Sequence, residues 1–123
     1  MKLDEGTVAH LRQAVELCGY DFDEVMSNHT RLRTYVDIRS VVWEICATET
    51  AAFPGEIGHR FGWNRSTVSY AIDKARELRE YDRQFRSLYD SIYSFYMVLE
   101  SNDTEFEDYA PLDIEDTLEG EMC

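Results

Sequence analysis

A run of hydrogen-bond donors occupies the middle of the chain. Asn64, Arg65 and Ser66 stand together, and three further donors follow on one side of a helical pattern. These further donors are Ser69, Tyr70 and Lys74. An arginine can bind guanine through two parallel hydrogen bonds, and an asparagine can pair with adenine in a similar way. Because the first turn of a helix also attracts anions, the pattern is typical of a helix that contacts duplex DNA.

The segment from residue 65 to about residue 79 is predicted to be a helix. Its apolar residues recur every three or four positions and therefore form one stripe. The stripe consists of Val68, Ala71, Ile72, Ala75 and Leu78. Asn64 is a suitable N-cap, because its side chain can accept from the free backbone N–H groups of the first turn. The donors are thus expected at the beginning and on the outer face of this helix.

A shorter helix is predicted directly before it. Pro54 favours a helix start, and Gly62 permits a tight turn after the segment. A short helix, a turn with glycine and a longer helix are the layout of a helix-turn-helix, whose second helix enters the major groove. We therefore predict a helix-turn-helix over 54–79. The residues expected to read bases are Asn64, Arg65, Ser66 and Ser69. Residues that could contact phosphates, and so position the protein without reading sequence, are Arg31, Arg33, Arg60, Thr67, Tyr70, Lys74 and Arg76.

The rest of the chain also favours an all-α fold. Further helices are predicted over 4–17, 21–26, 35–47 and 82–99. Within 35–47, Arg39 and Glu44 interrupt an otherwise apolar run. The last of these helices has an aromatic stripe, expected in the core or in a dimer seam. Trp63 is expected either to fill the core or to turn an edge toward phosphate. Residues 36–99 should be almost wholly helical, with no sheet.

Charge is distributed unevenly along the 123 residues, whose net charge is −13. Residues 28–92 carry ten basic and nine acidic groups, whereas residues 93–123 carry ten acidic groups and no basic one. We predict one small helical domain over 1–101, with a long C-terminal helix. An acidic tail is predicted over 102–123, disordered or loosely docked. Tails of this composition often engage another protein.

Several classes of protein are not favoured. No run approaches the roughly 20 apolar residues of a membrane span, and the N-terminus lacks a signal-peptide pattern, so a cytoplasmic protein without a membrane partner is expected. Cys18, Cys46 and Cys123 form no CxxC pair, and the three histidines are scattered, which predicts neither a disulfide framework nor a metal site. No carboxylate pair stands beside a nucleophile or base, so we expect neither an enzyme nor a cofactor.

Three stretches of the chain match one known family in order. Residues 36–45 read VDIRSVVWEI, residues 55–62 read GEIGHRFG and residues 64–71 read NRSTVSYA. Over roughly residues 30–92 the chain resembles the C-terminal domain of the bacterial replication initiator DnaA. The sharpest shared element is Glu-Ile-Gly, Phe-Gly, Thr-Val and Ala in sequence. The tryptophan repressor belongs to the same fold class.

The resemblance implies sequence-specific binding of double-stranded DNA, in replication control or transcription regulation, by a nucleoid-associated protein. Asn64, Arg65 and Ser66 match the positions at which that family reads bases with aspartate, histidine and threonine. Because the residue types differ, the preferred DNA sequence need not be the family's own. Thr67 matches the family directly.

The resemblance also assigns a role to the basic segment before the 35–47 helix. Arg31, Arg33 and Arg39 correspond to a region whose arginines approach phosphate and the minor groove in that family. The chain has no phosphate-binding motif and no room for an AAA+ ATPase domain. ATP-driven melting of DNA by this chain alone is therefore not expected.

A second interpretation is a protein-interaction module with a repurposed helix-turn-helix fold. The charge of −10 over 93–123 and the nearly balanced charge over 28–92 favour it, since DNA binding depends heavily on phosphate neutralisation. Binding to duplex DNA separates the two interpretations. The sequence leaves the oligomeric state and the DNA site open.

Overall fold

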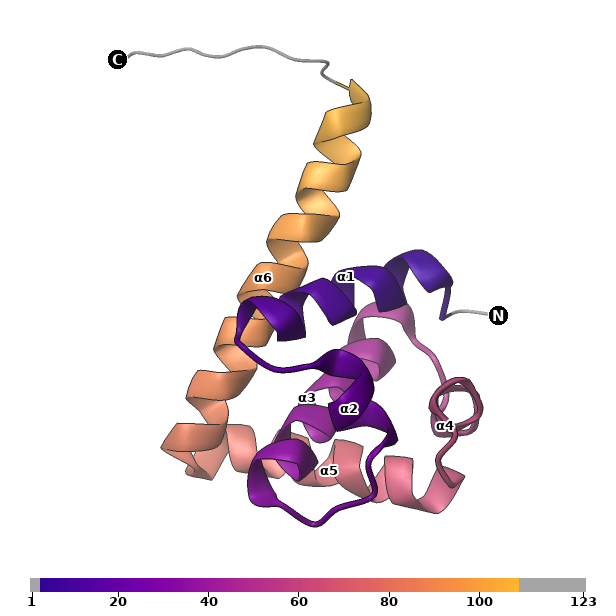
Figure 1. The fold of residues 1–123 in the computed structure, drawn as a ribbon, viewed down its shortest axis with the longest axis vertical. Coiled ribbons are helices and arrows are strands. Elements are labelled where there is room, and N and C mark those ends of the chain that lie inside the picture. Colours follow the sequence, from indigo (N-terminus) through magenta and orange to yellow (C-terminus); the bar gives the residue numbers. More distant parts are fainter. Residues whose placement is uncertain (1–2, 109–123) are drawn as a thin grey trace.

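The computed structural model describes the backbone of residues 3–108 and the side chains of residues 3–102. Over this range the chain forms six helices and no strand (Figure 1). The helices are α1 (Glu5–Leu17), α2 (Phe22–Ser27), α3 (Arg33–Thr50), α4 (Pro54–Phe61), α5 (Arg65–Tyr81) and α6 (Arg83–Asp108). The predicted all-α fold is confirmed, as is the nearly complete helicity of residues 36–99.

Helix α3 lies at the centre of the fold, because it contacts all five other helices. α1 packs across α6, and beyond this crossing α6 continues away from the body (Figure 1). Each helix contributes a buried apolar side chain to one core. Examples in chain order are Leu11, Phe22, Trp43, Ile57, Val68 and Ile92. No helix of the described part is both long and apolar enough to cross a membrane.

Four aspartate or asparagine side chains begin helices by accepting backbone N–H groups. Asp4 accepts from Thr7 at 2.8 Å and Asp21 from Glu24 at 3.1 Å. The cap of α5 agrees with prediction, because the side chain of Asn64 accepts from the N–H of Ser66 at 2.7 Å. At the start of α6 the side chain of Asp82 accepts from the N–H of Phe85 at 3.0 Å. Each cap satisfies an N–H group that has no partner within its helix. The N-terminus of α5, which carries the predicted reading residues, is therefore fixed by its own sequence.

Two helices are longer than the sequence pattern indicates. α3 extends beyond the predicted 35–47 at both ends, and α6 continues past residue 99 to Asp108. Residues 102–108, expected to be disordered or loosely docked, thus belong to α6. Apolar periodicity ends there, but no glycine or proline interrupts the segment, so the helix propagates. Residues 109–123 of the predicted tail lie outside the described residues.

The two interruptions in the apolar run of α3 are themselves buried. Arg39 is 5% exposed and Glu44 is 3% exposed. Residues 37–46 of α3 are all buried, so this part of the helix has no solvent-facing side to which these groups could turn. Both side chains must therefore find polar partners inside the fold.

Candidate nucleic-acid interface

Helices α4 and α5 are joined by the short turn of residues 62–64 (Figure 1). Gly62 has a φ of +76°, a left-handed conformation that glycine adopts without strain. The next N–H, of Trp63, donates to the carbonyl oxygen of Gly58 at 2.8 Å. Gly58 lies so near the turn that a Cβ atom there would be 2.4 Å from the carbonyl oxygen of Trp63. Two glycines four residues apart therefore allow α5 to follow α4 closely.

We expect Gly58→Ala to lower the free energy of unfolding by about 1–3 kcal/mol, because the added methyl group meets a backbone oxygen that cannot move aside. Gly55→Ala is the matched control in the same helix. A Cβ atom at Gly55 meets only the flexible side chain of Arg65, at 3.4 Å. Chemical denaturation of both variants measures the difference. Equal unfolding free energies for the two would contradict the close approach.

The outer face of α5 brings most of the predicted reading residues together. Arg65 and Ser66 are exposed and Ser69 is half-buried. They border a shallow depression of about 390 Å³ that Asp73 also lines. Asp73 is not among the contacts predicted from the sequence, although its spacing of four from Ser69 places it on the same face. A carboxylate there could accept from the amino group of cytosine.

Asn64 has a different role from Arg65, Ser66 and Ser69. Its side-chain oxygen accepts the N–H of Ser66 and caps α5. A two-bond pair with adenine needs that oxygen as an acceptor, so the cap competes with base reading. We therefore assign Asn64 to fixing the start of α5.

A second groove, of about 370 Å³, runs between α5, α3 and the connector before α3. Five of the residues predicted to contact phosphate line it: Arg31, Arg39, Thr67, Tyr70 and Lys74. Tyr70 is 68% exposed, and the Lys74 ammonium is 3.5 Å from the carboxylate of Glu77 at the surface. Such an exposed pair is weak and can be exchanged for another anion. Apart from Arg39, the groove can therefore present two cations, a hydroxyl group and a phenol to one ligand.

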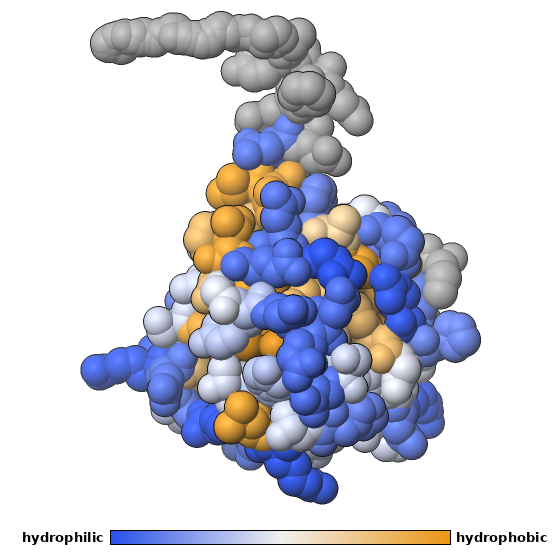
Figure 2. Space-filling view, viewed as in Figure 1, coloured by the Kyte–Doolittle hydropathy of each residue, from blue (hydrophilic) through white to orange (hydrophobic). Residues whose placement is uncertain are grey.

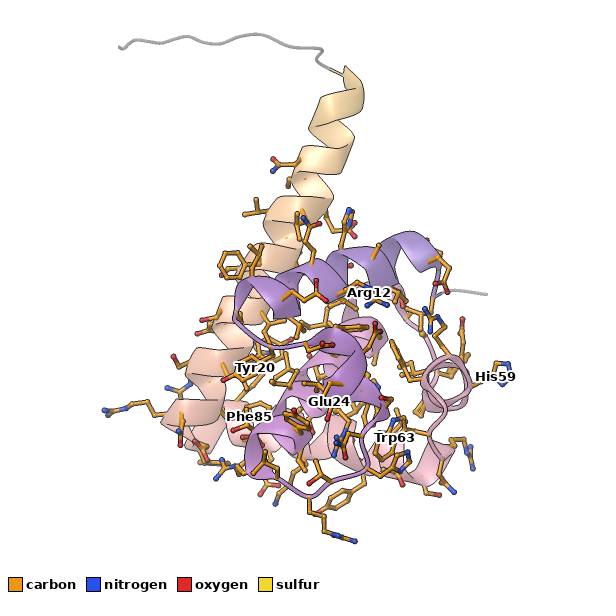
Figure 3. The ribbon with its side chains drawn as sticks, viewed as in Figure 1. Arg12, Tyr20, Glu24, His59, Trp63 and Phe85 are labelled. Atoms are coloured by element: carbon orange, nitrogen blue, oxygen red, sulfur yellow. The ribbon has the colours of Figure 1, made fainter. Side chains whose placement is uncertain are left out.

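Trp63 connects the turn to this connector (Figure 3). Its ring stacks on His29 with centroids 3.8 Å apart, and the guanidinium carbon of Arg39 lies 4.7 Å from its centroid. Its indole N–H donates to the carbonyl oxygen of Met26 at 2.7 Å. Of the two predicted roles the structure supports packing, because the polar edge of the ring is already engaged within the protein.

Arg39 is not available for phosphate, contrary to the sequence prediction. Its guanidinium group donates to the carbonyl oxygens of Val25, Asn28 and Thr30 at 3.1, 2.8 and 3.0 Å. Burial lowers the pKa of Arg39, yet the group has no carboxylate partner among the described residues. Its charge is stabilised by carbonyl dipoles that face it. Arg39 thus holds the connector over 28–30 in place and does not belong to the DNA-contact set.

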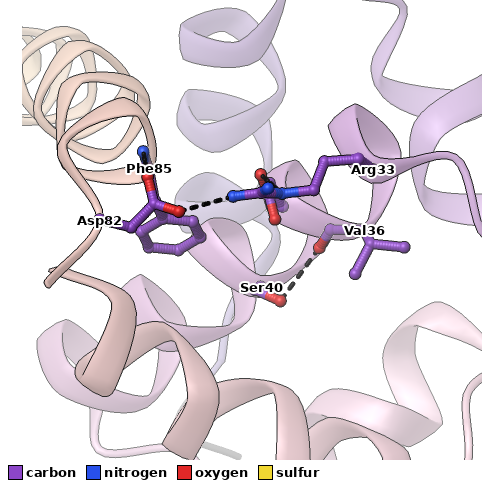
Figure 4. Close-up of polar contacts among 6 residues, drawn as sticks. Arg33, Val36, Ser40, Asp82 and Phe85 are labelled. Carbon is purple, nitrogen blue, oxygen red and sulfur yellow. Dashed lines mark hydrogen bonds and ion pairs between the residues drawn. The ribbon is translucent and has the colours of Figure 1, made fainter.

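Two other predicted phosphate contacts are engaged in ion pairs. Arg60 makes two hydrogen bonds to Glu5, at 2.7 and 2.8 Å, which tie α4 to α1. Arg33 contacts Asp37 at 2.9 Å and Asp82 at 2.8 Å, which ties the start of α3 to the start of α6 (Figure 4). The backbone N–H of Phe85 and the guanidinium of Arg33 lower the pKa of Asp82. Both arginines have structural partners in sequence-distant helices.

The arginines around the turn therefore fall into two groups. Arg33, Arg39 and Arg60 are held by partners inside the protein, and so is Arg76, whose Nε lies 3.2 Å from a Glu44 oxygen. Arg31 and Arg65 have no carboxylate partner in the described part of the chain. Residues 3–102 carry eleven basic and sixteen acidic groups, so positive charge is a local property of this face.

Comparison with protein-family models, with curated proteins and with solved structures gives no match.

Proposed function

We propose that this protein binds double-stranded DNA sequence-specifically, with α5 in the major groove, and acts in replication control or transcription regulation. One observation carries the proposal. The exposed start of α5 presents Arg65 and Ser66 to solvent without intramolecular ion pairs, although most neighbouring arginines are engaged. A helix that follows a tight turn and offers donors from its first turn suits recognition of base edges.

The groove beside α5 supports the proposal with contacts of a second kind. Arg31, Thr67, Tyr70 and Lys74 all line it. Cations and hydroxyl groups contact phosphate without reading bases, and such contacts fix the register of a protein on its duplex. The resemblance of residues 30–92 to the DnaA C-terminal domain favours the same assignment of reading helix and phosphate-contacting connector.

Substitution of the two unpaired arginines should affect DNA binding differently. Arg65→Ala should weaken binding to a selected duplex by about 1–3 kcal/mol, roughly five- to 150-fold, and relax specificity at one or two base pairs. Arg31→Ala should weaken all duplexes about equally and reduce the salt slope by about 1. The experiment is selection from random duplexes, followed by fluorescence anisotropy on the selected site and a scrambled site over a salt series.

Arg60→Ala is the matched control, because the structure commits this arginine to Glu5. The affinity of the Arg60→Ala variant for every duplex should stay within about twofold of the wild-type affinity. If Arg60→Ala weakens binding as much as Arg65→Ala, the reading face lies elsewhere. If wild type binds no duplex even at low salt, the protein-interaction module is the better assignment, which the acidic excess of residues 3–102 would then explain.

A further inference from the structure

The groove between α5, α3 and the connector before α3 has no acidic residue in its lining, although the chain has a net charge of −13. Arg31, Arg39 and Lys74 line it, and so does His29, whose ring becomes a cation when it is protonated. Figure 2 shows a predominantly hydrophilic surface over the lower part of the body, where the connector runs. The groove is therefore a local site for an anion within an acidic protein.

The imidazole ring of His29 is held in place although it is exposed. It lies nearly parallel to the ring of Trp63, with 8° between the planes and 3.8 Å between the centroids. The backbone is fixed on both sides of His29, because the carbonyl oxygens of Asn28 and Thr30 both accept from the guanidinium group of Arg39. His29 therefore has little conformational freedom left to lose when a ligand binds.

The two ring nitrogens of His29 have no hydrogen-bond partner in the described part of the chain. Stacking covers a face of the imidazole ring and leaves the nitrogens at its edge available. In contrast, Nδ1 of His10 lies 2.8 Å from a carboxylate oxygen of Glu100. His59 is exposed on α4, points away from the body (Figure 3) and does not line the groove. Of the three histidines, all of them described, only His29 combines a fixed ring, available nitrogens and a place in the groove.

We propose that the protonated ring of His29 contacts a DNA phosphate in this groove, together with Arg31 and Lys74. The protein would then take up one proton from solvent, at a ring nitrogen of His29, when it binds DNA. This inference rests on the proposed binding of duplex DNA. Histidine changes its charge within the physiological pH range, and a phosphate next to the ring favours the charged form. Protonation and DNA binding should therefore promote each other.

The charged and titratable groups around the groove leave the ring of His29 open to a phosphate. The lining contributes Arg31 from the connector, Arg39 from α3, and Tyr70 and Lys74 from α5. The carboxylates nearby have other partners. Glu24 of α2 accepts from the side chain of Asn28 at 2.7 Å, and Glu77 of α5 lies 3.5 Å from the Lys74 ammonium group. No carboxylate in the described lining thus competes with a phosphate for the protonated ring.

The test is the affinity for the selected duplex at about pH 8 and about pH 6, measured by fluorescence anisotropy over a salt series. Wild type should bind about three- to tenfold more tightly at the lower pH. The slope of log affinity against log salt should also be steeper there by about 1, because one further phosphate is neutralised. A purely structural role of His29 would not change this slope.

Two substitutions to glutamine assign the effect to one ring. His29→Gln keeps a hydrogen-bonding side chain that cannot become charged, so its affinity should match that of wild type at the higher pH and should not rise at the lower pH. His59→Gln is the matched control, because His59 is exposed but lies outside the groove. The His59→Gln variant should keep the full pH dependence of wild type.

His29→Arg tests the charge itself and covers the case in which His29→Gln loosens the connector. A guanidinium group can also stack on an aromatic ring, and it stays charged at both pH values. At the higher pH the affinity of His29→Arg should therefore match that of wild type at the lower pH.

Equal affinities of wild type at the two pH values would overturn the His29 contact and leave specific DNA binding intact. A pH dependence that His29→Gln retains would overturn it as well, and so would one that His59→Gln removes to the same extent. Absence of duplex binding at both pH values would instead overturn the proposed function, and the His29 contact with it.

Discussion

Arg39→Ala should be among the most destabilising single substitutions in this protein, with an expected loss of about 2–4 kcal/mol in the free energy of unfolding. The change removes three hydrogen bonds from a charged donor and leaves the carbonyl groups of Val25, Asn28 and Thr30 without that partner. It also opens a cavity against the ring of Trp63. Urea denaturation followed by circular dichroism measures the loss.

Arg39→Lys and Arg31→Ala are the controls for this prediction. Lysine keeps the charge but cannot reach three carbonyl oxygens with one ammonium group. The free energy of unfolding of Arg39→Lys should therefore lie between those of wild type and Arg39→Ala. Arg31 is exposed, and Arg31→Ala should change the unfolding free energy by less than about 0.5 kcal/mol. A stability of Arg39→Ala close to that of Arg31→Ala would disprove the structural role.

Glu44→Ala should have the second large effect, also a loss of about 2–4 kcal/mol in the free energy of unfolding. The carboxyl group is buried and accepts from Tyr89 of α6, from Thr48 of its own helix and from Arg76 of α5. It is therefore the point at which α3, α5 and α6 are joined by polar contacts. Removal leaves the Tyr89 hydroxyl group buried without its acceptor.

Glu49→Ala is a closely matched control for this second prediction. Glu49 also lies on α3 and also accepts a tyrosine hydroxyl of α6, from Tyr93 at 3.0 Å, but it does so at the surface. Glu49→Ala should lower the free energy of unfolding by less than about 0.5 kcal/mol. Similar losses for Glu44→Ala and Glu49→Ala would show that burial of the first pair has no energetic importance.

The same pair predicts a dependence on alkaline pH. Burial and the hydrogen bond to Glu44 raise the pKa of Tyr89 above its ordinary value. The unfolded chain therefore releases this proton at a lower pH than the folded protein, so stability should fall as the pH rises above about 10. Tyr89→Phe cannot release that proton, so its stability should decline less steeply than that of wild type over this range.

Much of the fold could be predicted because its signals are local. Asn64 and Asp82 begin helices as side-chain caps, Pro54 stands in a first turn, and Gly62 takes a left-handed conformation. Each of these depends on the residue and its immediate neighbours. The end of α6 was missed because the prediction relied on apolar periodicity, and a helix that leaves the body has no core to impose that period.

The candidate site was less predictable because ion pairing is not local. Arg60 and Glu5 are 55 positions apart, and Arg33 and Asp82 are 49 apart, so their engagement could not be inferred from spacing. Arg39 lay in the region matched to a phosphate-contacting segment, and only the fold shows it turned inward to backbone carbonyls. The sequence pattern did predict the exposed start of α5, whose side chains have no ion-pair partner elsewhere in the described part of the chain.

The packing of α1 across α6 also constrains how the chain can be made. The Nδ1 atom of His10 and a carboxylate oxygen of Glu100 lie 2.8 Å apart, although the two residues are 90 positions apart in the sequence. α1 packs more extensively against α6 than against any other helix, so during synthesis its apolar face leaves the ribosome before its main packing partner is made. Contacts of such high sequence separation form late, and uncovered apolar surface favours aggregation meanwhile. Truncated chains that end before α6 should therefore be more prone to aggregation and degradation than the finished protein.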